Sequence, residues 1–150
     1  MAAENMSLEF LVHVILVGIL ATYFLLAMAL WAHRIGLARL DFAKVMAGLS
    51  YGESFDGDPP YFAGQIVIYF NGIFFALLYA AAVGQYLPEP PLLAGAIWGV
   101  ILFLASGLFY VPLYLREGFF LSHVHKRAWM TSLMVHGGYG VILGWLCPVL

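Results

Sequence analysis

Four long apolar runs divide the chain, and shorter polar stretches separate each run from the next. A helix needs about 20 apolar residues to cross the ~30 Å hydrocarbon core of a bilayer. The runs that reach this length cover roughly residues 10–32, 62–86, 92–115 and 128–146. The pattern predicts an all-α fold, an integral membrane four-helix bundle that forms a single domain over residues 1–150.

A fifth, shorter helix is predicted between the first two runs, within the sequence DFAKVMAGL. Its apolar residues Phe42, Val45, Met46 and Leu49 recur at the spacing i, i+3, i+4, i+7, and Asp41 precedes them as a candidate N-cap. A short helix with one apolar face is suited to the membrane surface. We therefore expect an interfacial helix in the first cytoplasmic loop.

Composition supports the membrane class and excludes others. The chain is 64% hydrophobic and only 9% charged, whereas soluble domains carry roughly 25% charged residues. Its formal net charge is -2 and its six basic residues form no continuous stripe, so nucleic acid is not an expected partner. A single cysteine, Cys147, excludes an intramolecular disulfide and a four-cysteine zinc site.

The basic residues predict how the chain is oriented. All six follow either the first or the third apolar run, and they are Arg34, Arg39, Lys44, Arg116, Lys126 and Arg127. Loops rich in Lys and Arg face the cytoplasm. Both basic loops are therefore expected inside, and both termini on the outer, periplasmic side of a bacterial cytoplasmic (inner) membrane.

Small residues at regular spacing predict where these helices touch. Close backbone approach at Gly and Ala drives helix association in lipid, and the last three runs repeat such residues at intervals of three or four. The short turn LPEPP between the second and third runs predicts that they are antiparallel neighbours. The expected packing residues are Asn71, Gly72, Ala76, Ala80, Gly95, Gly99, Gly137, Gly140 and Gly144.

Two polar residues deep in the runs, Asn71 and His136, require an explanation, because an unbonded polar group in hydrocarbon costs several kcal/mol. Asn71 is expected to pair with another helix. For His136 one interpretation is a hydrogen bond between helices, to Asn71, Tyr69 or Ser106. The alternative is a role in binding a cofactor or substrate, since ionisable groups inside membranes are often functional.

The other histidines limit which cofactors are reasonable. His13 and His136 differ in depth by roughly 15 Å at 1.5 Å per residue, so they cannot ligate one haem together. His33, His123 and His125 all lie near the cytoplasmic boundary and could form a zinc or copper site. The alternative is that these three are simply solvated. The sequence requires no cofactor, and haem or a divalent metal are the candidates.

Motifs typical of enzymes are missing from the sequence. It contains no nucleophile elbow, P-loop, dinucleotide fingerprint or HExxH. We therefore expect no catalytic activity of its own.

Several short motifs resemble those of a group of small bacterial four-span integral membrane proteins of unknown function. They are GILAT at 18–22 with Leu40-Asp41, NGIFFALLYA at 71–80, the Pro112 region and HGGYGVILGW at 136–145. The resemblance covers most of the chain in the same order. It implies a four-span architecture and a helix contact that includes His136, and it implies no activity.

The function predicted from these features is that of a structural or accessory subunit, embedded in the lipid bilayer and packed against other membrane protein subunits. A respiratory or photosynthetic complex is the kind of assembly expected. The alternative is a haem- or metal-binding membrane protein that uses His136, or His33 with His123 and His125. A third hypothesis is a small oligomeric carrier or channel.

Overall fold

The computed structural model describes residues 6–52 and 54–150, and all regular structure in these ranges is helical. The α-helices are α1 (Leu8–Trp31), α2 (Phe42–Tyr51), α3 (Tyr61–Leu78), α4 (Pro91–Ala105) and α5 (Ala128–Leu146). Short 3-10 segments are η2 (Ala32–Ile35), η4 (Gly84–Tyr86) and η6 (Phe119–Leu121), and π-helical segments are η3 (Tyr79–Val83) and η5 (Ser106–Leu115).

Three continuous helical stretches are long and apolar enough to cross a membrane. They are Leu8–Ile35, Tyr61–Tyr86 and Pro91–Leu115. Helix α5 has 19 residues, but its glycines, His136 and hydroxyl side chains make it less apolar than these three. The protein is thus a helical membrane protein with helices in all four predicted ranges, three of which have the composition of membrane spans.

Local sequence explains where several helices begin and end. Ser7 caps α1, because its Oγ accepts a hydrogen bond of 3.1 Å from the Phe10 amide. Asp41 caps α2 in the same way, by accepting from the Lys44 amide at 3.1 Å. Pro91 occupies the start of α4, where its missing N–H has no intrahelical partner to lose.

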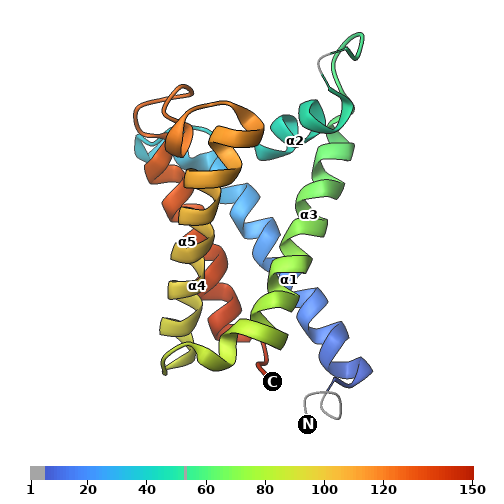
Figure 1. Ribbon diagram of the computed structural model, residues 1–150, viewed down its shortest axis with the longest axis vertical. Coiled ribbons are helices and arrows are strands. Elements are labelled where there is room, and N and C mark those ends of the chain that lie inside the picture. The colour runs from blue at the N-terminus through green and yellow to red at the C-terminus, as the bar shows by residue number, and fades with distance from the viewer. Residues whose placement is uncertain (1–5, 53) are drawn as a thin grey trace.

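The first turn of α1 and the C-terminus lie at one end of the bundle, and α2 lies at the other with the loop between η5 and α5 (Figure 1). The two segments that carry all the Lys and Arg residues therefore meet at the same end. They are joined directly, because Arg127 donates a hydrogen bond of 2.9 Å to the Gly36 carbonyl and Thr131 Oγ1 one of 2.8 Å to the Ala38 carbonyl. At the opposite end, His13 Nε2 donates to the Leu146 carbonyl at 3.0 Å.

Helix α2 forms where the hydrophobic spacing predicts it. Ala43, Met46 and Ala47 are buried, whereas Val45 and Leu49 are 40% and 45% exposed. Helix α2 packs closely on α3, where a Cβ at Gly64 would overlap the Ala43 carbonyl oxygen. One face of α2 is thus used against α3, and Val45 and Leu49 of the predicted apolar pattern stay exposed.

Candidate functional site: a cavity that opens between two helices

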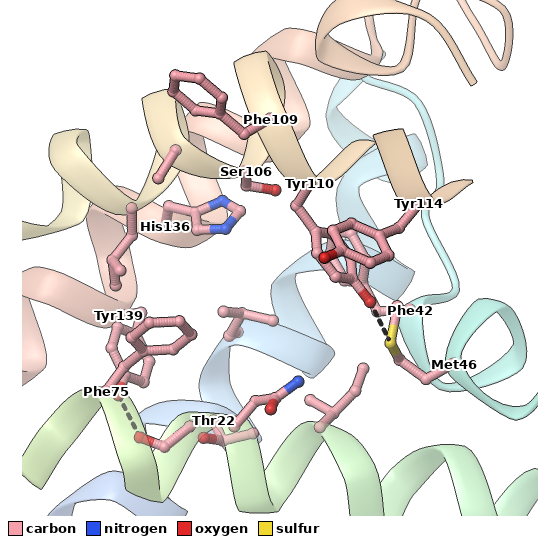
Figure 2. A pocket seen from close by; sticks show the side chains of 16 residues that line it. Thr22, Phe42, Met46, Phe75, Ser106, Phe109, Tyr110, Tyr114, His136 and Tyr139 are labelled. Carbon is pink, nitrogen blue, oxygen red and sulfur yellow. Dashed lines mark hydrogen bonds between the residues drawn. The ribbon is translucent and has the colours of Figure 1, made fainter. Parts of the chain in front are cut away.

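A cavity of 420 Å³ lies inside the bundle, between α1, α3, α5 and η5, with α2 at one end (Figure 2). Most of its wall is apolar, and none of the described Lys, Arg, Asp or Glu residues lines it. Its lining residues are Thr22, Leu25, Phe42, Met46, Ile68, Asn71, Gly72, Phe75, Leu102, Ala105, Ser106, Phe109, Tyr110, Tyr114, His136 and Tyr139.

The cavity exists because one pair of helices does not pack. Helix α3 packs on α1, α1 on α5, and α5 on α4, but α3 and α4 make few contacts with each other. Figure 1 shows α3 and α4 on opposite sides of the molecule, although only the short turn after η4 joins them. The prediction that these two helices are packed neighbours is therefore wrong: they are antiparallel, and the site opens sideways between them.

Helices α4 and α5 approach so closely that their backbones touch. A Cβ at Gly95 would overlap the Gly140 carbonyl oxygen, and a Cβ at Gly99 would overlap that of His136. A Cβ at Gly144 would overlap the Pro91 carbonyl oxygen and would lie 3.0 Å from the Gly95 Cα. Such an approach is available only to glycine, and it fixes the backbone of His136 against α4.

Helices α1 and α3 form a second close contact, which holds the other wall of the cavity. A Cβ at Gly72 would overlap Thr22 Oγ1, and a Cβ at Gly18 would lie 3.0 Å from the Ala76 Cβ. Thr22 Oγ1 donates back to the Gly18 carbonyl at 2.7 Å. The small residues of α3 thus face α1, which leaves its larger side chains for the cavity and the outside.

His136 reaches the cavity from α5, and its ring projects toward the centre (Figure 2). Its Nδ1 donates a hydrogen bond of 2.7 Å to the Ser132 carbonyl, one turn earlier on the same helix. This partner differs from the predicted Asn71, Tyr69 and Ser106. The second nitrogen, Nε2, makes no hydrogen bond with the described residues, so it faces the cavity as a free polar atom.

Asn71 also lies on the cavity wall rather than against another helix. It is exposed, and its amide forms no hydrogen bond within residues 6–52 and 54–150. The prediction that it pairs with a neighbouring helix is therefore wrong. The amide opens into the same space as His136, from the opposite wall.

The segment η5 supplies one complete wall of the cavity. Pro112 predicts a bend, and the structure has a π-helix from Ser106 to Leu115 around it, a form that often occurs at functional sites. The Tyr110 hydroxyl donates to Met46 Sδ at 3.2 Å and so joins η5 to α2 (Figure 2). Tyr110 and Tyr114 stack with ring centroids 5.4 Å apart.

The histidines at the end of the bundle that carries the Lys and Arg residues do not form a ligand set. His33 Nδ1 donates to the Leu30 carbonyl at 2.9 Å, and His125 Nδ1 accepts from the Arg127 amide at 3.0 Å. Among the residues that the structure describes, no three His, Cys, Asp or Glu side chains are grouped so that they could hold a metal ion. His33, His123 and His125 are therefore not brought together.

Known proteins give no guide to this site. Comparison of the chain with protein family models, curated proteins and solved structures finds no match. The interpretation of the cavity rests on its own geometry.

Tyr139 is a site residue that sequence reasoning missed, although its position three residues after His136 places both on one face of α5. Its hydroxyl donates to the Gly72 carbonyl at 2.5 Å and so ties α5 to α3 across the bundle. We expect Tyr139→Phe to lower the free energy of unfolding by roughly 0.5–1.5 kcal/mol, because it removes a buried hydrogen bond between two helices. Unfolding by SDS in mixed micelles measures this loss, and an unchanged midpoint would contradict it.

Proposed function

We propose that this protein is a four-span membrane protein that binds a lipid-soluble small molecule in the cavity between α3 and η5. The observation that carries the proposal is a cavity of 420 Å³ with an apolar wall and a few polar groups, His136, Asn71 and Ser106, converging on it. Ligand sites in proteins are typically about 300–1,000 Å³ and have this kind of lining.

The position of the opening suits a ligand that arrives from the bilayer. Phe109 and Tyr114 on η5 line the cavity and are nevertheless 63% and 65% exposed. Side chains of this kind are compatible with lipid, so an apolar molecule can enter sideways without passing through water. A polar ligand would meet no charged group on the wall to compensate for its lost hydration.

Labelling with a photoreactive ligand tests the proposal. A long-chain alcohol carrying an aliphatic diazirine is expected to modify cavity residues when the purified protein is irradiated in lipid nanodiscs. Ala105→Phe should reduce this labelling several-fold, because Ala105 lines the cavity. Leu104→Phe is the matched control, since Leu104 is 42% exposed beside it and does not line the cavity. Equal labelling of both variants would contradict the proposal.

The proposed topology has four spans, with both termini outside and the basic end of the bundle in the cytoplasm. Its support is the convergence of both basic segments at one end of the bundle and the general bias of Lys and Arg toward the inside. Helix α5 lies between α1 and α4, which supports its being the fourth span. The same orientation places α2, which lies next to the basic end, at the inner membrane surface. The sequence resemblance supports a bacterial cytoplasmic membrane.

Cysteine labelling checks this orientation. In a Cys147→Ala background, a cysteine at Glu89 is expected to react with a membrane-impermeant maleimide on intact cells, and one at Ser50 only after the membrane is opened. Both positions are exposed. Burial raises the pKa of the Cys147 thiol to about 12, so the native thiol reacts slowly near neutral pH. Labelling of Ser50→Cys on intact cells would reverse the proposed orientation.

A second candidate function is the accessory subunit of a larger membrane complex. The same open side favours it, because a partner helix could pack where α3 and α4 do not contact each other. A photoreactive benzoylphenylalanine at Phe109, which lines the cavity and is exposed, is irradiated in native membranes to distinguish the two. A crosslink to one defined membrane protein supports the subunit, whereas adducts with lipid alone contradict it.

A further inference from the structure

We propose that the ligand of this cavity is an uncharged ring-bearing alcohol, of the alkylphenol or quinol class, whose hydroxyl group donates a hydrogen bond to His136 Nε2. This inference rests on the proposed function and specifies the ligand class. It begins with the bond that His136 already makes. The Ser132 carbonyl can only accept, so Nδ1 carries the proton, and Nε2 of the neutral imidazole is then an acceptor.

Within the part of the chain that the structure describes, no donor forms a hydrogen bond with Nε2. Three of the hydroxyl groups on the wall already donate elsewhere: Thr22 to Gly18, Tyr139 to Gly72 and Tyr110 to Met46. An acceptor left unpaired in an apolar cavity costs roughly 1–3 kcal/mol. A ligand with an O–H group removes that cost when it binds.

The remaining polar groups are suited to the same head group. Ser106 and Asn71 line the cavity, and neither makes a side-chain hydrogen bond within residues 6–52 and 54–150. Both can donate as well as accept, so they can bind further oxygen atoms of the ligand. No Lys, Arg, Asp or Glu lines the cavity, which disfavours carboxylate, phosphate and ammonium head groups because a buried charge needs a partner.

Aromatic side chains make up much of the rest of the wall and favour a flat ring over a plain alkyl alcohol. They are Phe42, Phe75, Phe109, Tyr110, Tyr114 and Tyr139. Aromatic pairs gain about 0.5–1.5 kcal/mol beyond the area they bury. The apolar remainder of the ligand would lie toward the opening between α3 and η5, where the lining residues Phe109 and Tyr114 are exposed.

Three matched probes test the head group: 4-nonylphenol, its methyl ether, which cannot donate, and nonylbenzene, which has no polar head. Each competes with the diazirine alcohol for the cavity of the full-length protein in nanodiscs. We expect the phenol to compete roughly ten-fold more strongly than the ether, which corresponds to one hydrogen bond. His136→Leu should remove this difference, and Leu104→Ala, which alters a side chain outside the cavity, should keep it.

The outcomes separate this inference from the proposed function. If the ether competes as well as the phenol, the hydroxyl donor is wrong although the cavity still binds apolar molecules. If none of the three competes, the proposed function fails with it. If His136→Leu does not fold, the comparison of phenol with ether in the unaltered protein still decides. Co-purified phospholipid that fills the cavity, or a haem absorption band lost in His136→Gln, would also overturn the inference.

Discussion

Gly140→Ala is expected to lower the free energy of unfolding by roughly 1–3 kcal/mol, because the added methyl group has no space. A Cβ at this position would overlap the Gly95 carbonyl oxygen and would lie 2.7 Å from the Gly99 amide nitrogen. Both atoms belong to the backbone of α4, so no side-chain movement relieves the overlap. SDS-induced unfolding in mixed micelles measures the loss, and size-exclusion chromatography in mild detergent should show less folded protein.

Gly137→Ala is the matched control on the same helix. No atom lies within 4 Å of a Cβ built at Gly137, and alanine favours a helix over glycine by roughly 1 kcal/mol. This variant should therefore be as stable as the parent protein or more stable. Equal destabilisation by the two substitutions would show that the α4–α5 contact is not as close as the structure has it.

Gly72→Ala is expected to be the second strongly destabilising substitution, by a similar roughly 1–3 kcal/mol, and here a second substitution should restore stability. A Cβ at Gly72 would overlap Thr22 Oγ1, and the three atoms nearest to it all belong to the Thr22 side chain. Thr22→Ala removes Oγ1 and Cγ2 and leaves the Cβ at 3.0 Å. The double variant should therefore lose less unfolding free energy than the sum of the losses in the two single variants.

A double-mutant cycle gives the coupling between these positions, which we expect at roughly 0.5–3 kcal/mol in favour of the double variant. Additive losses would contradict the described packing of α1 on α3. No such rescue is expected for Gly140, because the atoms that a Cβ there would overlap belong to the backbone of α4. The two glycines thus distinguish a contact that side chains can adjust from one that they cannot.

The positions of the helices follow closely from hydrophobic runs. The predicted first run, 10–32, corresponds to α1 at Leu8–Trp31, and the last, 128–146, to α5 at Ala128–Leu146. The length of an apolar run predicts a helix well here, because each helix that crosses a membrane of fixed thickness needs one long stretch of apolar residues. The helix caps Ser7 and Asp41 act locally, and Asp41 could therefore be identified from the sequence.

The pairing of the helices could not be predicted, because a pattern of small residues on one helix does not show which other helix it contacts. Small residues recur on every long helix, and the short turn after η4 suggests that α3 packs on α4. In the structure Gly72 fits Thr22 on α1, and Gly95 fits Gly140 on α5. Because α3 packs on α1 and α4 packs on α5, α3 and α4 do not pack on each other, and the cavity opens between them.

The candidate site was predictable only in part. His136 stands out because it is an ionisable residue in an apolar run, but its partner proved to be a carbonyl one turn away on its own helix. A local bond of this kind satisfies one nitrogen without any other helix. Asn71 was expected to be paired, yet it faces the cavity, which depends on tertiary packing that no spacing of residues along the chain reveals.

Helix α1 holds the molecule together, because it packs on α3 and on α5 to a similar extent. Helices α2 and α3 lie on one side of it and α4 and α5 on the other, and the hydrogen bonds from Tyr139 to Gly72 and from Tyr110 to Met46 also join the two halves. An occupant of the cavity would touch both halves and bridge them. The filled protein should therefore melt at a higher temperature than the empty one.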